Sequence, residues 1–475
     1  MMPDDNNRLS TICAPATAQG GAIAVIRLSG PDAITIADSI FRPITGSQLS
    51  ARKGYTIARG YITDNDGNTV DDVLASIFRA PHSYTGEDCI ELSCHASPYI
   101  VQRLLEMLCS AGCRLAEPGE FTRRAFINGK MDLSQAEAVA DLIAATSAAE
   151  HRTAMNQMRG TFSNKLAALR EQLLRLTSLM ELELDFSDHE DLEFADRSEL
   201  KKISDDIESV VAGLARSFCV GNAIRRGVAV AIVGETNVGK STLLNALVGD
   251  DRAIVSDFHG TTRDAIEDCT VIGGVRFRFI DTAGIRHTDD IIESLGIERS
   301  YKAIDKADIV ILLLDLARLD LGKGVDSAAL LESVPTAISK QLEDKKVVVV
   351  LNKCDLVPST IEPDNSHEQT SHPILISAKH GNNIEALRRH LVSLAAIPEV
   401  APGDVVVTNA RHYQALLKAL ADIHNVQTAL SENQPTDLVC EDLRLCLHHL
   451  AEITGGEITS QETLNNIFAH FCVGK

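Results

Sequence analysis

Short runs of alternating apolar and polar residues dominate the first part of the chain. Such alternation predicts strands that bury one face, over residues 22–28, 55–63, 70–78 and 87–94. The Asp66-Gly67 pair between the second and third runs predicts a hairpin turn. Residues 99–110 instead carry apolar side chains at helical spacing. We therefore expect an α/β domain of short strands and helices over residues 1–125.

The pattern of apolar residues becomes helical over residues 134–185, where they recur at steps of three and four. A second helix is expected over residues 198–219, followed by a linker at 221–227, which begins and ends with glycine. Helical spacing returns at 384–394, 412–430 and 436–454. Because each helical portion is small for a stable domain, we expect 126–225 and 387–475 to pack together as one helical domain.

Continuous apolar runs replace this pattern between the two helical portions. Residues 228–233, 309–315 and 347–352 show no polar face, which is typical of parallel strands buried on both sides. Residues 275–280 alternate, and 374–376 form a shorter run. These runs predict a mostly parallel sheet flanked by helices over residues 226–386, inserted into the helical domain. The expected fold class is a multidomain chain, α/β plus all-α.

The amino-acid composition restricts the kinds of function that this chain can have. The 475 residues include 66 acidic and 45 basic side chains, a formal net charge of −21. An acidic chain is not a general nucleic-acid coater, so any RNA must meet a local basic patch or a partner protein. The 11 cysteines form no CxxC pair, which favours reduced thiols. The start resembles no targeting peptide and no apolar run spans a bilayer, so we expect a cytoplasmic protein that does not contact membranes.

The strand at 228–233 runs into GETNVGKS, Gly234 to Ser241, and then into a helical run. This strand–GxxxxGK[ST]–helix order is the context of a phosphate-binding P-loop. Backbone N–H groups and the helix N-terminus would bind phosphate oxygens. Lys240 would reach the β- and γ-phosphates, and the Ser241 hydroxyl would ligate Mg²⁺.

Three further motifs follow at strand ends, in the order that a guanine-nucleotide-binding domain requires. Asp281 to Gly284 is a DxxG motif, which places a carboxylate near Mg²⁺ and an amide near the γ-phosphate. Asn352-Lys353-Cys354-Asp355 has the NKxD form, whose carboxylate can accept two guanine N–H groups that adenine lacks. Ser377-Ala378-Lys379 can offer an amide to the guanine carbonyl. Between the P-loop and DxxG, a threonine of Gly260-Thr261-Thr262 can complete the Mg²⁺ shell.

The residue after DxxG bears on how GTP would be hydrolysed. It is Ile285, where a Ras-type GTPase has a glutamine that orients the attacking water. Other groups must therefore take part, and Arg286, Asp289, Asp290 and Glu293 are the candidates nearby. A monovalent cation could supply positive charge in place of an arginine finger, with Asn237 as a neutral oxygen ligand.

Several stretches together resemble the MnmE (TrmE) family of tRNA-modification GTPases over nearly the whole chain. They are IRLSG at Ile26, YTGED at Tyr84, PGEFTRRAFINGKMDLSQAEA at Pro118, GTTRD at Gly260, DTAGIR at Asp281 and the terminal FCVGK. The resemblance implies an N-terminal folate-binding and dimerising domain, a helical domain and an inserted potassium-dependent G domain. It also implies a homodimer that acts on tRNA with an FAD-containing partner, MnmG (GidA). Together they would add an aminomethyl-type group to carbon 5 of the wobble uridine.

The resemblance also assigns roles to individual residues. It implies that Glu293 and Cys472 are catalytic, that Ser241 and Thr262 bind Mg²⁺, and that Asn237, Ser256, Phe258 and Thr261 bind K⁺. Formyl- or methylene-tetrahydrofolate would contact Arg27, Glu91, Lys130 and Lys475. GTP contacts are expected from Asn237, Val238, Gly239, Lys240, Ser241, Thr242, Ser256, Asp257, Phe258, His259, Gly260, Thr261, Thr262, Asp281, Thr282, Ala283, Gly284, Asn352, Lys353, Asp355, Ser377, Ala378 and Lys379.

Some alternatives stay open at this point. Lone charges inside strands, such as Arg27 and Glu91, are ordinarily solvent-facing, and Cys94-His95-Ala96-Ser97-Pro98 departs from a glycine-rich family pattern. A regulatory GTPase switch in ribosome assembly is one rival, although no basic RNA-binding module follows the G domain. A folate-using metabolic enzyme regulated by GTP is another, although no separate substrate site is visible.

Overall fold

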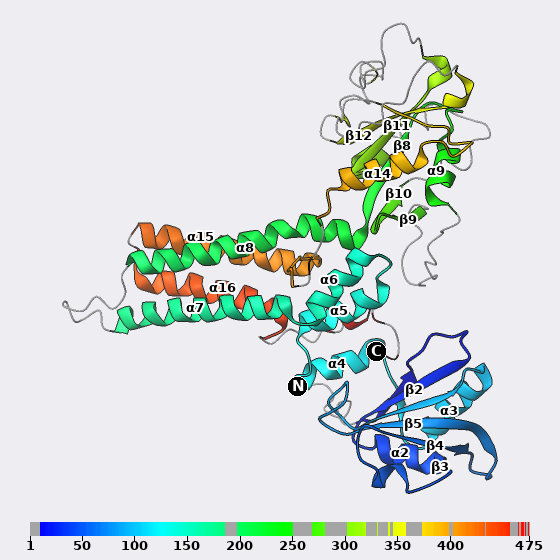
Figure 1. The fold of residues 1–475 in the computed structure, drawn as a ribbon. Coiled ribbons are helices and arrows are strands. Elements are labelled where there is room, and N and C mark those ends of the chain that lie inside the picture. The colour runs from blue at the N-terminus through cyan, green and yellow to red at the C-terminus, as the bar shows by residue number, and fades with distance from the viewer. Residues whose placement is uncertain are drawn as a thin grey trace. The chain divides into compact units, whose positions relative to one another are not determined.

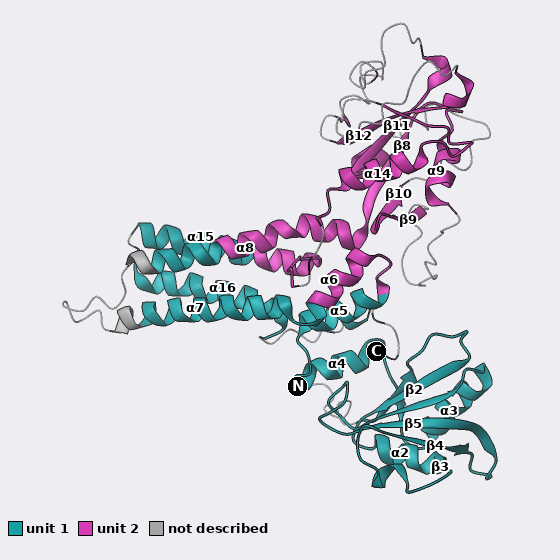
Figure 2. Cartoon of the chain, viewed as in Figure 1, with its two compact units in different colours: residues 1–143, 157–208, 418–475 teal, residues 144–156, 209–417 magenta. Residues whose placement is uncertain are grey.

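The structure is a computed structural model. It describes residues 10–185, 197–249, 268–280, 302–319, 330, 341–342, 345–357, 373–398, 401, 403–432, 434–456, 464, 467–469, 471 and 474. The multidomain chain has two groups of strands, separated along the sequence by the helices from Glu120 to Arg226 and followed by further helices (Figure 1). The chain divides into two compact units, one of residues 1–143, 157–208 and 418–475, the other of 144–156 and 209–417 (Figure 2).

A seven-stranded sheet forms the N-terminal part of the first unit. Its order is β3-β4-β5-β6-β2-β1-β7, and all neighbours are antiparallel except β1 and β7. Helices α2 (Ala33–Ile40) and α3 (Pro98–Ser110) contribute Ile34 and Leu104 to one buried core with Ile26 and Leu92 of the sheet. The strands are β1 Ile12–Pro15, β2 Ile23–Ser29, β3 Phe41–Pro43, β4 Thr56–Thr63, β5 Thr69–Phe78, β6 Cys89–His95 and β7 Arg114–Leu115.

The hairpin predicted at Asp66-Gly67 is present between β4 and β5. Gly67 has φ +86°, a conformation that glycine adopts at little cost, and its N–H donates to the Asp64 carbonyl. All four strands expected from alternation are found within one or two residues of their predicted ends. The short strands β1, β3 and β7 and helix α2 were not predicted, since each is too short to show a period.

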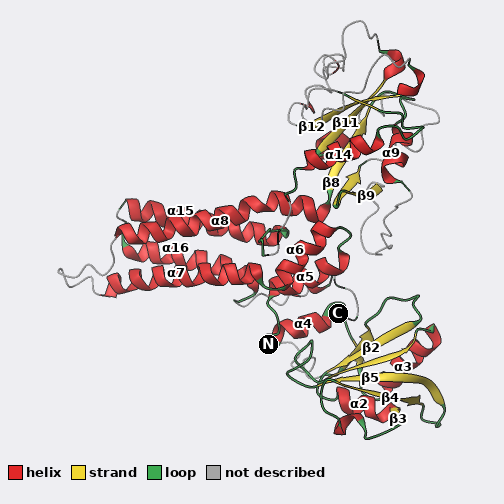
Figure 3. Ribbon diagram, in the orientation of Figure 1, coloured by secondary structure: helices red, strands yellow, loops and turns green. Residues whose placement is uncertain are grey.

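Helices occupy most of the remaining described chain outside the second sheet (Figure 3). They are α4 Glu120–Ile127, α5 Leu133–Ala144, α6 Ala148–Met158, α7 Thr161–Asp185, α8 Arg197–Arg226, α15 Ala410–Ser431 and α16 Thr436–Thr454. Helices α7 and α16 pack along each other. By length and composition alone, residues 200–226 of α8 could cross a membrane, but a single such helix is weak evidence, because helices of soluble proteins pass the same test. Leu200, Ile207 and Val211 of this helix are buried within the protein.

The linker predicted at residues 221–227 is wrong, because α8 continues through Arg226 and only Gly227 separates it from the next strand. Gly221 is inside the helix for a packing reason. A Cβ there would overlap the carbonyl oxygen of Val407. The glycine therefore allows a close approach of backbone to backbone and does not mark a flexible joint.

A six-stranded sheet lies in the second unit, in the order β13-β12-β11-β8-β10-β9. All neighbours are parallel except β9 and β10, so the mostly parallel sheet predicted from continuous apolar runs is confirmed. The strands are β8 Val228–Val233, β9 Asp268–Ile272, β10 Val275–Phe279, β11 Ile309–Asp315, β12 Lys346–Asn352 and β13 Ile374–Leu375.

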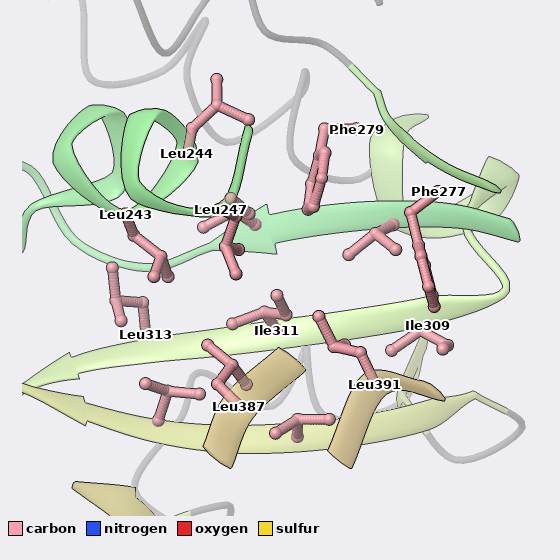
Figure 4. Packing of buried hydrophobic residues seen from close by; sticks show 14 of the residues in the cluster. Leu243, Leu244, Leu247, Phe277, Phe279, Ile309, Ile311, Leu313, Leu387 and Leu391 are labelled. Atoms are coloured by element: carbon pink, nitrogen blue, oxygen red, sulfur yellow. The ribbon is translucent and has the colours of Figure 1, made fainter. Parts of the chain in front are cut away.

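Both faces of this sheet are buried. Leu243 and Leu247 of α9 (Lys240–Val248) and Leu387 and Leu391 of α14 (Ile384–Ala395) pack on one face with alternate residues of β8, β10 and β11 (Figure 4). A second cluster, which includes Ala231, Val233, Val310 and Leu342, covers the other face. The predicted domain boundary at 386 therefore needs correction, since it falls inside a helix whose apolar side belongs to this core.

Candidate functional site

The P-loop connects β8 to α9 at the carboxyl end of the six-stranded sheet. Gly234 has no room for a side chain, because a Cβ would overlap the Leu313 carbonyl oxygen. Gly239 has φ +103°, and a Cβ there would overlap the Asn352 amide nitrogen. Asn237 takes φ +61°, a left-handed conformation that asparagine tolerates better than most residues. The loop thus has a backbone conformation that glycine at positions 234 and 239 and asparagine at position 237 permit.

Lys240 is the first residue of α9, and its ammonium lies over the loop. It donates hydrogen bonds to the carbonyl oxygens of Gly234 and Glu235, both at 2.8 Å. Burial lowers the pKa of the Lys240 ammonium, so an added anion at this position would be favourable. Ser241 and Thr242 follow in the first turn of the helix, where N–H groups lack helical partners and favour phosphate oxygens.

Asn352 connects the P-loop to the loop at residues 377–379. Its side-chain nitrogen donates to the Val238 carbonyl at 2.8 Å, and its side-chain oxygen accepts from the Ala378 N–H at 2.9 Å. Asn352 is 3% exposed, so each bond is protected from water. The amide group therefore fixes the spacing between two motifs that lie far apart in the sequence. A guanine carbonyl would have to compete with Asn352 for the Ala378 N–H.

Asp355 is held beside the same loop. The Ser377 hydroxyl donates to a carboxylate oxygen of Asp355 at 2.6 Å, and this bond lowers the pKa of the Asp355 carboxyl. The carboxylate is thus ionised and able to accept N–H groups. His380 lies 3.7 Å from its other oxygen. Val238, Lys240, Asn352, Asp355 and Ser377 are therefore gathered at one end of the sheet, as the motifs predicted.

Other predicted residues lie outside the described part of the chain, and their predictions stand untested. They are Ser256, Asp257, Phe258, His259, Gly260, Thr261, Thr262, Asp281, Thr282, Ala283, Gly284, Glu293, Cys472 and Lys475. Among the residues that are described, no group of three or more His, Cys, Asp or Glu side chains is placed to hold a metal ion. The described ligand candidates are neutral oxygens, the Ser241 hydroxyl for Mg²⁺ and the Asn237 amide for K⁺.

A second cluster surrounds Arg27 on β2. Its guanidinium donates to Glu91 on the paired strand β6 at 2.9 Å, and its Cζ lies 5.2 Å from the ring centroid of Tyr84 and 5.6 Å from that of Phe121. The Arg27 side chain is only 15% exposed, so the solvent-facing alternative is wrong for this residue. The charge is partly buried together with its counter-ion and two aromatic rings, which offset the cost of desolvation.

The end of the chain reaches this cluster. The Gly474 carbonyl accepts a hydrogen bond from Arg27 at 3.3 Å, and a Cβ on Gly474 would overlap the Pro15 carbonyl oxygen. Lys130 is placed differently. Its ammonium donates to the Pro81 carbonyl at 3.0 Å, and its stem lies against Gly86. It is therefore bonded to the backbone of the loop that carries Tyr84, and to neither Arg27 nor Glu91.

A buried polar network that the sequence did not predict supports the loop. Ser29 hydrogen-bonds to Thr85 at 2.6 Å and to Glu87 at 2.7 Å, and Arg124 pairs with Glu87 and with Glu120, each at 3.1 Å. The network connects β2, the YTGED loop and α4, so it fixes the positions of Tyr84 and Phe121 around Arg27. The only sequence signal was that these residues fall within three of the quoted motifs.

Comparison with known proteins covers nearly the whole chain. The model of the MnmE helical domain matches residues 133–472, and that of the GTP-binding protein TrmE N-terminus matches residues 11–130. The tRNA modification GTPase MnmE of Parabacteroides distasonis is 56% identical over 470 residues, 98% of this chain and 100% of that protein. The protein of the same name from Flavobacterium psychrophilum is 49% identical over 466 residues, 98% and 99% of the two chains.

Solved structures give a weaker likeness. A crystal structure of Era in complex with MgGDPNP and nucleotides of 16S ribosomal RNA is 26% identical, with a TM-score of 0.24 over 42% of this chain and 66% of that one. A score this low carries no argument. The family models and the full-length relatives are sufficient without it: the chain belongs to the MnmE family of tRNA modification GTPases.

Proposed function

We propose that the carboxyl end of the six-stranded sheet binds and hydrolyses GTP. The observation that carries the proposal is the pair of hydrogen bonds by which Asn352 connects the P-loop to the 377–379 loop. A phosphate-binding loop alone would not distinguish one nucleotide from another. The Asn352 side chain fixes the distance between the P-loop and the loop that holds Asp355. The phosphate site and the base site are therefore separated by a fixed distance, as the binding of a single nucleotide requires.

Each described side chain then has a task. Lys240 would exchange its two carbonyl partners for phosphate oxygens, and the ionised Asp355 would accept guanine N–H groups. The Ser241 hydroxyl would hold Mg²⁺ with Thr262, and Asn237 would hold K⁺ with Ser256, Phe258 and Thr261. Such cations supply positive charge where the transferred phosphoryl group gains negative charge. Glu293 would orient or deprotonate the attacking water.

We further propose that hydrolysis serves tRNA modification, in the cytoplasm and with a flavoprotein partner of the MnmG type. The relatives' name and their coverage of the whole chain support this over the rival of a ribosome-assembly switch. The protein would act as a homodimer with its G domain inserted into the helical domain. The Arg27 cluster would bind the folate, because a guanidinium–carboxylate pair between two aromatic rings offers donors, acceptors and apolar faces to a planar, partly anionic ligand.

Two experiments test these proposals separately. Asp355→Asn should weaken GTP binding by about 100-fold or more and improve binding of xanthosine triphosphate, whose altered base suits an amide. A wild-type protein that binds ATP as tightly as GTP would contradict the base assignment. For the tRNA part, mass spectrometry of wobble uridines from cells that lack the gene should show loss of the modification at carbon 5. Unchanged uridines would favour the ribosomal rival.

A further inference from the structure

We propose that Asp315 is a positioning residue for the guanine site, and that it acts by holding the ammonium of Lys353 in place before nucleotide binds. The proposal rests on the proposed GTP-binding function and adds a residue that belongs to none of the four nucleotide-binding motifs. Asp315 is the last residue of β11, on the strand next to the one that ends in Asn352.

Strand register brings the two residues together. In the parallel pairing of β11 with β12, Asp315 lies opposite Asn352, and Lys353 is the next residue along. Lys353 has φ +66°, outside the region that a lysine normally occupies. Its side chain therefore turns back toward β11 and does not continue the line of β12. A left-handed lysine directly after a buried strand is a strained arrangement that its surroundings must maintain.

The contact between them is close and sheltered. The Lys353 ammonium lies 2.7 Å from the Asp315 Oδ2 atom, and the Asp315 side chain is 9% exposed. The other carboxylate oxygen, Oδ1, accepts the Ala317 N–H at 3.1 Å and so caps the short helix at Leu316–Arg318. The two carboxylate oxygens of Asp315 thus have separate roles: Oδ1 accepts a backbone N–H, and Oδ2 pairs with the Lys353 ammonium.

A second cation near Asp315 does not take over this role. Arg318 lies 3.6 Å from Asp315 and 3.6 Å from Glu235 of the P-loop, but its side chain is 62% exposed. Solvent and salt screen such contacts, so exposed pairs contribute little. Lys353 is the better-placed partner, because it combines the shorter distance with the smaller exposure.

What the ion pair would accomplish follows from the lysine side chain. Lysine has many rotamers, and a ligand that orders it on binding gives up part of the affinity gained. With its ammonium already held by Asp315, the Lys353 stem is ordered in the free protein beside the base-reading Asp355. Asp315 would therefore raise guanine-nucleotide affinity without contacting the nucleotide.

The test uses the division of labour between the two oxygens. Asp315→Asn keeps an oxygen for the Ala317 N–H and removes only the charge that attracts Lys353. We expect it to release GDP about 5–20 times faster and to raise KM for GTP with kcat almost unchanged, in proportion to a lost charge-assisted hydrogen bond. Lys353→Met keeps the stem and should show a similar or larger loss.

The double variant gives a readout that a merely structural role would not. If Asp315 acts through Lys353, Asp315→Asn should cause no further loss in a Lys353→Met background. Asp308→Asn is the matched control: Asp308 precedes the same strand and accepts the Ala229 N–H at 2.8 Å, an acceptor role that an amide can keep. Arg318→Ala is the second control, and both should release GDP at the wild-type rate.

Two results would overturn the proposal while leaving the GTP site intact. One is an Asp315→Asn protein that binds GDP like the wild type, and the other is an equal loss with and without Lys353. A wild-type protein that fails to bind guanine nucleotides would instead overturn the proposed function, and this inference with it.

Discussion

The guanidinium of Arg27 donates a hydrogen bond to the carbonyl of Gly474, a residue 447 positions further along the chain. The contact places Gly474 against strand β2, which lies near the opposite end of the sequence. Gly474 is held there by shape as well, because its backbone lies directly against Pro15. Phe471, three residues earlier, is buried as well, so packing holds both Gly474 and Phe471 in place.

The first prediction follows from that anchor. Gly474→Ala adds a Cβ that would overlap the Pro15 carbonyl, at φ +96°, where a side chain costs about 1–2 kcal/mol in strain alone. The terminal segment should leave the Arg27 cluster, with folate binding weakened and GTP hydrolysis unchanged. Equilibrium binding of a tetrahydrofolate measures the first effect and phosphate release the second. Gly456→Ala, where the nearest contact is 3.6 Å away, is the control. If Gly474→Ala binds folate normally, the C-terminal segment does not contribute to folate binding at the Arg27 cluster.

The relation between Arg27 and Gly474 shows where sequence reasoning stops. The strand that carries Arg27 was predictable, because residues 22–28 are a mostly apolar run that ends at Ser29-Gly30-Pro31. Whether its charge faced water was not, since that depends on Tyr84, Phe121 and the chain end, which only the folded chain brings together. Only the family resemblance pointed to this residue.

The strands of the six-stranded sheet were easier to predict from the sequence than the surroundings of Arg27. The strand Ile309–Asp315 was predicted with both ends correct, because a strand buried on both faces is an unbroken apolar run and Asp315 ends it. The same run could not reveal what Asp315 does. Its pairing with Lys353 depends on the register of β11 against β12, which a one-dimensional pattern does not contain. Gly221 misled for a similar reason, since its partner is the distant Val407.

The second prediction compares two glycines in helix α8. Gly221→Ala should lower the free energy of unfolding by about 1–3 kcal/mol or more, because the new Cβ would overlap the Val407 carbonyl. Gly213→Ala should raise it by about 0.5–1 kcal/mol, because nothing lies within 4 Å of the new Cβ and alanine favours helix. Urea unfolding of both variants measures the contrast. Two substitutions with the same effect would show that Val407 does not lie against the helix at Gly221.

The third prediction concerns pH. The hydrogen bond from Ser377 lowers the pKa of Asp355, so the carboxylate stays ionised, and able to bind guanine, to lower pH than an ordinary aspartate. Binding should be complete above the usual aspartate pKa of about 3.9 and fall as pH drops through the lowered value. In Ser377→Ala that pKa rises, so affinity should be lost at a higher pH. GDP affinity measured for both proteins between about pH 3 and 6 tests this. If the two proteins lose GDP affinity at the same pH, the Ser377 hydroxyl does not lower the pKa of Asp355.

The fourth prediction tests the cation proposed at the P-loop. GTP turnover should be faster in potassium than in sodium, and this difference should vanish when the Asn237 side chain is removed. Because Asn237 has φ +61°, alanine would add backbone strain there, and Asn237→Gly removes the amide oxygen without it. Affinity for GDP in sodium serves as the control and should change little. Equal turnover of the wild-type protein in the two salts would remove potassium from the mechanism.

The last prediction separates hydrolysis from modification. The family resemblance implies that Cys472 and Glu293 are both catalytic, and we propose that Cys472 serves the modification and Glu293 the hydrolysis of GTP. Cys472→Ser should therefore leave GTP turnover nearly intact and abolish wobble-uridine modification. Glu293→Ala should lose turnover with GTP affinity almost kept, the pattern of a residue needed only in the transition state. If modification requires the GTP cycle, that variant should lose modification as well. The measurement is modified uridine in bulk tRNA from a deletion strain complemented with each variant, beside turnover of the purified proteins. Full modification with Cys472→Ser would exclude the thiol, and full modification with a variant that cannot hydrolyse GTP would break the coupling.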